Sequence, residues 1–148
     1  MMNSELTVDK ESAMDVVAAG QAVFHFSQGL PGFEELTRFL LCEREGLQPL
    51  TLLIALDAAD VALPLLRSAE FLTDYSPPIP ASDLEALEAK SVKDLDLFVV
   101  VTFEGTGGSV AVNLRAPICV NLTRRLGRQV VLPDGTYPLQ HPLFEPHE

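Results

Sequence analysis

The sequence has few of the features that small proteins use for secretion, membrane insertion or covalent cross-linking. It contains only two cysteines among 148 residues, Cys42 and Cys119, which lie far apart in separate apolar runs. This spacing favours two buried free thiols in a reducing compartment over a disulfide. No apolar run approaches the roughly 18 residues of a membrane span. The N-terminus also has no basic region followed by an apolar core, so we expect a cytoplasmic protein without a signal peptide or membrane anchor.

Residues that could carry out chemistry form no catalytic or metal-binding motif. The histidines, His25, His141 and His147, have no partner at helical spacing, and neither cysteine has a partner at metal-ligand spacing. No serine lies in a nucleophile-elbow sequence. Pairs of acidic residues are frequent because the whole chain is acidic, and we interpret them as solvated faces. The sequence therefore predicts no enzyme, no cofactor, no metal and no small-molecule substrate.

The run Gly-Thr-Gly-Gly-Ser at 105–109 is the segment most similar to a phosphate-binding loop. A phosphate loop needs a helix after it, so that the helix N-terminus faces the anion. An alternating strand pattern follows instead, and the Gly-Lys-Ser/Thr ending is missing. This run is therefore expected to be the tip of a β-hairpin.

Positive charge is scarce. The chain has 10 lysine or arginine residues against 21 acidic residues, which gives a formal charge of −11. Such a surface repels nucleic acid and anionic membranes and attracts basic proteins, although solubility alone also explains it. Arg124, Arg125 and Arg128 form the one basic cluster, without a flanking aromatic for base stacking. We interpret it as a hairpin that balances nearby acids or contacts an acidic surface, in preference to an RNA contact.

Short apolar or alternating runs dominate the chain and predict strands. Pro64 should place its strand at a sheet edge or distort it, because proline cannot donate a ladder hydrogen bond. One helix is expected at 82–89, where Ser82 and Glu85 form a capping box and Leu84 and Leu87 share a face. This pattern is typical of a small β-barrel or sandwich. The expected strands are 15–26, 38–43, 51–56, 61–66, 95–103, 109–114, 118–122 and 129–132.

The stretch Phe-Ser-Gln-Gly-Leu-Pro-Gly-Phe-Glu at 26–34 predicts a type II turn, with Pro31 at its second position and Gly32 at its third. Gly29 would let the incoming strand bend. We expect Phe33 to fold back over the barrel as a lid, and the alternative is that it projects towards a ligand. Such a turn would expose Leu30.

The length suits one domain. The polar, mixed-charge residues 1–14 are expected to be a flexible tail, residues 15–140 a single β-barrel domain, and residues 141–148 a C-terminal tail.

Four blocks in order resemble the flagellar assembly factor FliW family. They are Gly-Leu-Pro-Gly-Phe-Glu near residue 30, Thr-Asp-Tyr near 75, Ser-Val-Ala-Val-Asn-Leu-Arg-Ala-Pro-Ile-Cys-Val-Asn at 109–121, and Gly-Arg-Gln-Val-Val-Leu-Pro-Asp-Gly-Thr-Tyr-Pro-Leu at 127–139. The middle of the chain, 50–70, departs from the usual family pattern, so the chain resembles a divergent member. The resemblance implies structural roles for Gly29, Pro31, Gly32, Asn113, Leu114, Ala116, Pro117, Asn121, Gly127, Gln129 and Tyr137.

The resemblance also implies a closed or nearly closed β-barrel-like domain capped by one short α-helix. It implies a cytoplasmic regulator that binds flagellin and the translational regulator CsrA, and that relieves repression of flagellin translation. The alternative is a protein-interaction module of another pathway that keeps this fold. The residues expected to contact partners are Leu30, Phe33, Glu34, Asp57, Asp60, Glu70, Asp74 and Tyr75.

Overall fold

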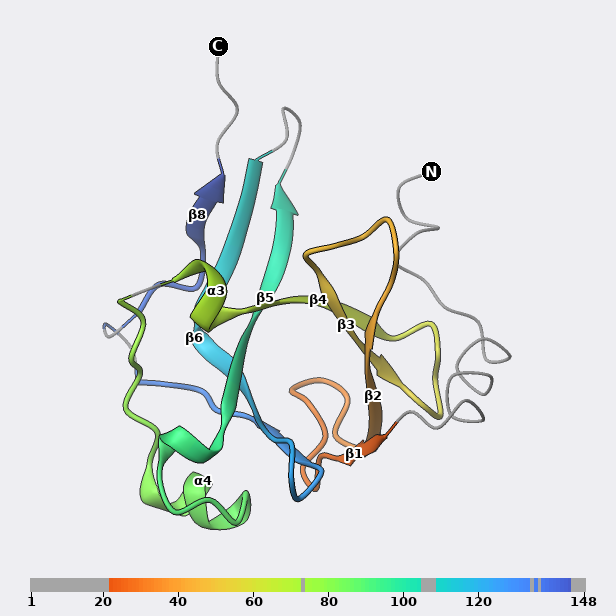
Figure 1. Cartoon of the computed structure of the whole chain (residues 1–148), viewed down its shortest axis with the longest axis vertical. Coiled ribbons are helices and arrows are strands. Elements are labelled where there is room, and N and C mark those ends of the chain that lie inside the picture. The colour runs from red at the N-terminus through yellow and green to blue at the C-terminus, as the bar shows by residue number, and fades with distance from the viewer. Residues whose placement is uncertain (1–21, 73, 105–108, 134, 136, 145–148) are drawn as a thin grey trace.

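The computed structural model of the chain describes residues 22–72, 74–104, 109–133, 135 and 137–144. The strands in these ranges form one sheet in the order β5-β4-β3-β2-β1-β7-β6-β8. Because β5 also pairs with β6, strands β1 to β7 close into a barrel, and β8 extends the sheet outside it (Figure 1). This arrangement confirms the expected mainly β, barrel-like fold.

The first five strands follow the apolar runs of the sequence. Each pairs antiparallel with the next along the chain, as short connections favour. Residues 15–21 of the first expected strand lie outside the described residues. The observed strands are β1 (Val23–His25), β2 (Arg38–Glu43), β3 (Thr51–Ala55), β4 (Ala62–Arg67) and β5 (Asp96–Glu104).

The expectation of an edge position for the proline-containing strand is wrong. β4 lies between β3 and β5 in the sheet. Pro64 pairs with Leu52 of β3, whereas the pairing with β5 begins only at Leu65. The missing N–H of the proline is therefore tolerated in an interior strand, because only one neighbour flanks the strand at that residue.

The two strands expected at 109–114 and 118–122 are one strand, β6 (Ser109–Asn121), of 13 residues. β6 pairs with β5 on both sides of a bulge, at which residues 114–117 stand opposite the single residue Val99. The Asn113 side-chain oxygen accepts the N–H groups of Arg115 at 3.0 Å and Ala116 at 3.1 Å. The Arg-Ala-Pro sequence thus bends the strand at a side-chain-capped bulge, without ending it.

β7 (Leu126–Gln129) begins earlier than the strand expected at 129–132. The turn before it is tight because Arg125 adopts a positive φ of 61°. After β7 the chain still follows β6, since the Val130 N–H donates to the Pro117 carbonyl and the Leu132 N–H to the Arg115 carbonyl. The bulge in β6 interrupts regular pairing here, so these residues bond to the strand without forming part of it.

β8 (His141–Phe144) pairs antiparallel with β6, although the sequence assigned these residues to a C-terminal tail. It is the outermost strand of the sheet, and Pro142 lies within it, opposite Ala111. The remaining tail residues, 145–148, the expected N-terminal tail 1–14 and the expected hairpin tip 105–108 lie outside the described residues. The strands flanking that tip, β5 and β6, pair antiparallel up to Glu104 and Ser109.

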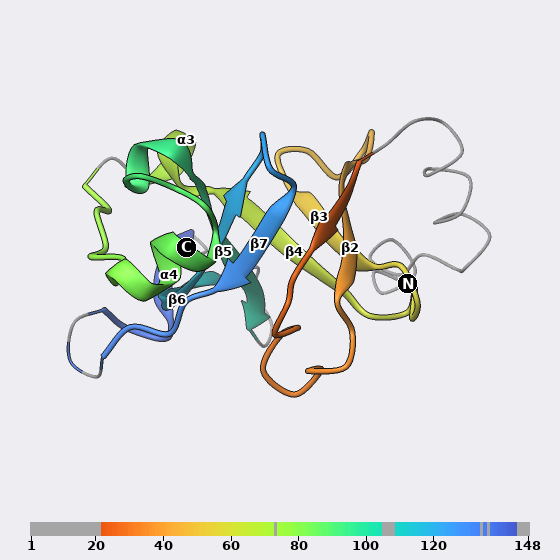
Figure 2. The ribbon, with the colours of Figure 1, turned by 90° about the horizontal axis from the view of Figure 1, so that it is seen from below.

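The described residues contain two short α-helices, α3 (Ser68–Phe71) and α4 (Ala81–Ala86), and a 3-10 turn, η1 (Val92–Asp94). The expected capping box is absent: Pro80 is the N-cap of α4, and no side chain caps the helix. Figures 1 and 2 show α3 and α4 together at one end of the barrel.

Helix α4 ends by a specific backbone motif that fixes the following chain. Glu88 adopts φ 55°, and the Ala89 N–H donates back to the Leu84 carbonyl at 2.9 Å. This is the hydrogen bond of a Schellman ending. Leu84 and Leu87 pack in one apolar cluster against the sheet, which confirms their expected shared face.

Aromatic residues fill the interior of the barrel. Phe26, Phe39 and Phe98 are fully buried, and the rings of Phe26 and Phe39 meet edge to face at 4.9 Å. Each buried aromatic side chain stabilises the fold by about 1.5–3 kcal/mol through the hydrophobic effect alone. The hollows described below therefore lie on the outside of a packed core.

The barrel closes where β1 runs parallel to β7, and this seam is thin. One residue pair joins the two strands, His25 with Leu126, and the His25 N–H donates to the Arg125 carbonyl at 2.9 Å. The Phe26 ring lies directly on Gly127, where an added Cβ would stand 2.3 Å from ring carbons. Only glycine permits this contact, so Gly127 and Phe26 together seal the barrel.

Both cysteines are free thiols, as expected, but only one is fully buried. Cys119 lies in the core, where burial raises the pKa of its thiol to about 12. Cys42 is half-buried on β2, so the expectation that it is buried is wrong.

Substitution of Gly127 by alanine should destabilise the fold by about 1–3 kcal/mol, because the methyl group overlaps the Phe26 ring. Denaturant unfolding measures the change. In a Phe26→Leu background the same substitution should cost much less, because leucine has no ring over this position. An equal cost in both backgrounds would contradict the proposed contact.

Thiol labelling at pH 8 should modify Cys42 within minutes and leave Cys119 unmodified until the protein unfolds. The buried Cys119 thiol stays protonated at this pH because its pKa is raised, and the thiolate is the reactive form. A Cys42→Ala variant should therefore show no labelling in the native state and one thiol in denaturant. Rapid native labelling of that variant would contradict the burial of Cys119.

Candidate functional site

The residues expected to contact partners lie in three separate places. Glu70, Asp74 and Tyr75 belong to α3 and the segment after it, whereas Asp57 and Asp60 form the turn between β3 and β4. Figures 1 and 2 show these two regions at opposite ends of the molecule. Leu30, Phe33 and Glu34 lie in the loop between β1 and β2. No single surface therefore contains all eight residues.

The loop between β1 and β2 contains the predicted type II turn. Gly32 adopts φ 87°, and the Phe33 N–H donates to the Leu30 carbonyl at 2.7 Å, so Pro31 and Gly32 are the central residues. Gly29 also has a positive φ of 62°, and an added Cβ there would stand 2.4 Å from the Phe33 carbonyl oxygen. The Glu34 carboxylate accepts a hydrogen bond from the Gly32 N–H at 3.1 Å, and this bond stabilises the turn.

The two apolar side chains of this turn, Leu30 and Phe33, lie opposite to expectation: Leu30 is buried and Phe33 is exposed. Leu30 is 3% exposed and packs in the main core, so the expectation that the turn exposes it is wrong. Phe33 is 39% exposed and therefore is not a buried lid. The hydrogen-bonded turn points Leu30 inwards, and this leaves Phe33 and Glu34 available at the surface.

Asp57 is already engaged within the chain. Its carboxylate forms a salt bridge with Arg38 of β2, with Arg38 Nε 3.1 Å from Asp57 Oδ2. Hydrogen bonding and charge attraction to Asp57 raise the pKa of Arg38 above its usual value. Asp60, in the same turn, is exposed. This end of the molecule therefore offers less free negative charge than the sequence indicates.

A groove of about 570 Å³ lies between α3 and η1, and several of its lining side chains are apolar. We call it the α3–η1 groove. Val92, at its edge, is 41% exposed, and Glu70 is exposed beside it on α3. Its lining residues are Arg67, Ser68, Ala69, Leu72, Tyr75, Ser76, Pro77, Val92, Leu95, Asp96 and Leu97.

Polar contacts hold both walls of the α3–η1 groove. Arg67 pairs with Asp96 at 2.5 Å, and its guanidinium lies over the Phe98 ring at 4.9 Å. The Tyr75 hydroxyl donates to the Leu114 carbonyl at 2.6 Å, while its ring meets Tyr137 edge to face. Burial, together with nearby Cys119 and Tyr137, raises the pKa of Tyr75, so the hydroxyl remains a donor. Tyr75 therefore supports the groove more than it projects from it.

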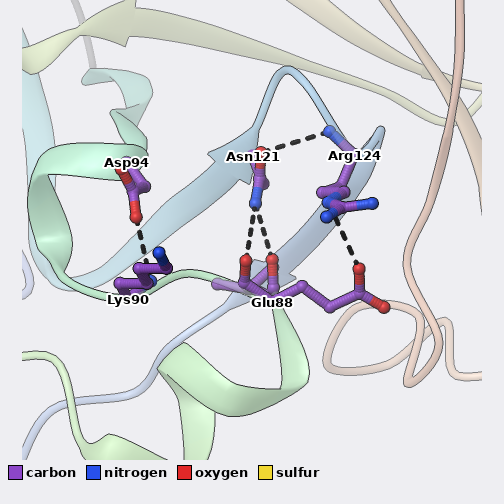
Figure 3. Close-up of polar contacts among 6 residues, drawn as sticks. Glu88, Lys90, Asp94, Asn121 and Arg124 are labelled. Carbon is purple, nitrogen blue, oxygen red and sulfur yellow. Dashed lines mark hydrogen bonds and ion pairs between the residues drawn. The ribbon is translucent and has the colours of Figure 1, made fainter.

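A second, polar hollow of about 430 Å³ lies next to this groove and shares Asp96 with it. Asn121 organises it, as Figure 3 shows. The Asn121 amide donates to the Leu87 carbonyl at 2.8 Å, at the end of α4, and its oxygen accepts the Arg124 N–H at 3.2 Å. Asn121 is 4% exposed and thus joins α4 to the β6–β7 turn from within.

The basic cluster is used to neutralise acids of the same chain. Arg124 lies 3.5 Å from Glu88, and Arg128 pairs with Asp83 of α4 at 2.6 Å in a partly buried position. Arg125 stacks over the Phe24 ring at 5.7 Å. This is the balancing role that the sequence favoured, and it leaves little free positive charge for an RNA backbone.

Within the described parts of the chain, no three His, Cys, Asp or Glu side chains gather closely enough to hold a metal ion. The same residues include no helix that is long and apolar enough to span a membrane. The described residues form a packed barrel with grooves on its surface.

Known proteins resemble this chain over nearly all of its length. A sequence model of a protein family described as "FliW protein" matches residues 7–143. The chain belongs to the FliW family. It is 34% identical over 139 residues to the flagellar assembly factor FliW of Thermotoga maritima, covering 93% of each chain. It is 28% identical over 123 residues to the Clostridium tetani protein of that name, covering 83% of this chain and 85% of the other.

The fold agrees as well. A crystal structure of the flagellar assembly factor FliW superposes with a TM-score of 0.77 at 30% sequence identity, covering 85% of this chain and 87% of that one.

Residues of two of the blocks that resemble the FliW family gather at the bulge of β6, although the sequence separates them by up to 24 positions. The Gln129 amide donates to the Ala116 carbonyl at 2.9 Å, and the Arg115 side chain donates to the Tyr137 carbonyl at 3.0 Å. The Leu114 N–H donates to the Pro138 carbonyl at 3.1 Å. The motif therefore encodes a junction between β6 and the chain after β7.

Two surface features escaped the sequence analysis. Helix α3 is too short to show a helical period, and Val131, which is 62% exposed, lies in a run that the sequence assigns to a strand. A strand pattern that ends at Leu132 wrongly makes Val131 a regular strand residue. No signal in the sequence identifies Val131 as exposed.

Replacing Asn121 by alanine should destabilise the protein by about 1–3 kcal/mol, because it leaves the Leu87 carbonyl and the Arg124 N–H without partners. Thermal and denaturant unfolding measure the loss. Arg124→Ala, which removes only the exposed pair with Glu88, is the matched control and should change stability by about 0–1 kcal/mol. Equal effects of the two substitutions would contradict the bridging role of Asn121.

Proposed function

We propose that this protein is a cytoplasmic regulator of flagellum assembly that binds flagellin and a CsrA-type translational regulator. Its membership in the FliW family carries the proposal, because the relatives are named flagellar assembly factors. By binding the translational regulator, it relieves the repression of flagellin translation. It acts by binding proteins and has no catalytic role.

Charge supports a basic partner. A translational regulator that binds RNA presents basic residues, and a chain of formal charge −11 attracts it while staying off RNA itself. Two arginines of the β6–β7 hairpin are paired with Glu88 and Asp83, so these pairs add no net positive charge that would repel such a partner.

We assign the flagellin or regulator contact to the α3–η1 groove. Its apolar floor and the exposed Val92 suit an amphipathic helix, which places its apolar face in a groove and its basic residues on an acidic rim. Asp74 supplies that rim together with Glu70, whose exposed carboxylate also lies 4.0 Å from Arg67 Nε. Phe33 and Glu34, in the β1–β2 loop, form a second exposed surface that a partner could contact. Asp60, in the β3–β4 turn, marks a third.

The binding of CsrA should depend on the negative charge beside the α3–η1 groove. We expect Glu70→Lys with Asp74→Lys to weaken binding of purified CsrA about tenfold or more in titration calorimetry at low salt, corresponding to about 1.4 kcal/mol. A matched pair away from the groove, Glu35→Lys in the β1–β2 loop with Asp60→Lys in the β3–β4 turn, carries the same change in net charge and should have a small effect.

The outcomes separate the alternatives. If the wild-type protein binds neither flagellin nor CsrA, the functional proposal is wrong and the chain is an interaction module of another pathway. If the Glu35/Asp60 pair weakens binding more than the Glu70/Asp74 pair, the groove assignment is wrong while the function stands. Competition between the two partners then shows whether they share one surface.

A further inference from the structure

The seam of the barrel carries a hollow of about 580 Å³ that the α3–η1 groove does not include. It lies between the loop 27–34 and the chain that runs from β7 to Val131. The hollow exists because β1 pairs with β7 at one residue only and the chain then turns away at Phe26. Its lining includes Ser27, Gln28, Pro31, Glu34, Gln129 and Val131.

Backbone groups on this side of the chain point into the hollow. The N–H groups of Val130 and Leu132 donate to β6, at 3.0 Å and 2.7 Å. Because backbone directions alternate along an extended chain, the N–H of Val131 faces the opposite way. Among the residues that the structure describes, none accepts a hydrogen bond from it, and the residue is 62% exposed. One wall of the hollow is therefore an extended stretch of chain, continuous with β7, whose Val131 N–H has no acceptor among the described residues.

The rim of the hollow is negatively charged. Arg128 also lines it, but its guanidinium is held by Asp83 at 2.6 Å. Glu34 is exposed and uses one carboxylate oxygen only for the neutral Gly32 N–H, and Glu35 beside it is exposed as well. A segment that enters the hollow thus meets uncompensated carboxylates from the turn.

We propose that this hollow is a second protein-binding surface, which takes an extended, basic segment of a partner protein as an added strand along β7 and Val131. Main-chain hydrogen bonds to the edge supply the affinity, and alternate side chains supply the specificity. A lysine or arginine of the segment faces Glu34, and a small apolar side chain contacts Pro31 and Val131. The inference does not depend on the identity of the flagellar partners.

The probe is an acetylated and amidated octapeptide of alternating lysine and valine, titrated into the labelled full chain and followed by NMR. Binding should shift the amide signals of Gln129 and Val131 and slow the hydrogen exchange of the Val131 amide. The same peptide with N-methylated valines keeps the charge but cannot pair as a strand, and should bind about tenfold more weakly or less.

Val131→Lys opposes a basic segment and should weaken binding of the unmodified peptide about tenfold. Leu139→Lys is the matched control, because Leu139 is 52% exposed and lies outside the hollow, and it should bind like the wild type. Val131→Pro removes the facing N–H, leaves both hydrogen bonds to β6, and should act like Val131→Lys.

Equal binding of the methylated and unmodified peptides, or equal losses in Val131→Lys and Leu139→Lys, would show attraction by general charge and overturn the proposal. Protection of amides elsewhere, or no binding at millimolar peptide, overturns it too. If sedimentation shows that Val131→Lys abolishes a dimer of the free chain, the occupant is a second copy and the proposed partner segment is wrong.

Discussion

The bulge of β6 is the constraint on which the rest of the structure depends. Residues 114–117 of β6 stand opposite the single residue Val99 of β5. The Asn113 side-chain oxygen accepts hydrogen bonds from the two N–H groups, of Arg115 and Ala116, that lose their partners in β5. The carbonyls of residues 114–117 are thereby released from β5. They accept instead from Tyr75, Leu132, Gln129 and Val130. One local distortion thus anchors the chain after β7 and the segment after α3, and that segment forms one wall of the α3–η1 groove.

The same distortion explains how a long strand serves two parts of the molecule. The half of β6 after the bulge belongs to the closed barrel with β7, and the half before it pairs with β8 outside that barrel. The barrel closes between β1 and β7 through fewer contacts. These are the single pair of His25 with Leu126 and the Phe26 ring against the Gly127 backbone. The molecule is therefore strongly connected at β6 and weakly connected at the β1–β7 seam, and the hollows lie next to these two junctions.

Sequence periodicity predicted the first five strands and the barrel class, because each of those strands is a short apolar run bounded by turn residues. It failed where tertiary contacts override local chemistry. Pro117 predicts a break in the strand, yet β6 continues through it because the Asn113 side chain accepts a hydrogen bond from the Ala116 N–H at the bulge. Ser82 and Glu85 read as a helix cap, yet Pro80 is already the first flanking residue of α4. For the candidate site, the sequence identified the turn at Pro31–Gly32 but reversed Leu30 and Phe33, since the direction of a turn depends on the core beneath it.

Pro142 has a consequence for how concentrated solutions of this protein behave. An outermost strand with free backbone groups is a template on which further chains can add, and this is how many β proteins aggregate. β8 occupies that outermost place, and its proline lacks one of the donors that such growth requires. The chain thus protects its broad open edge against indiscriminate association, whereas the short edge at Val131 carries no such block. The contrast suits a protein that accepts a chosen segment at one place and stays monodisperse elsewhere.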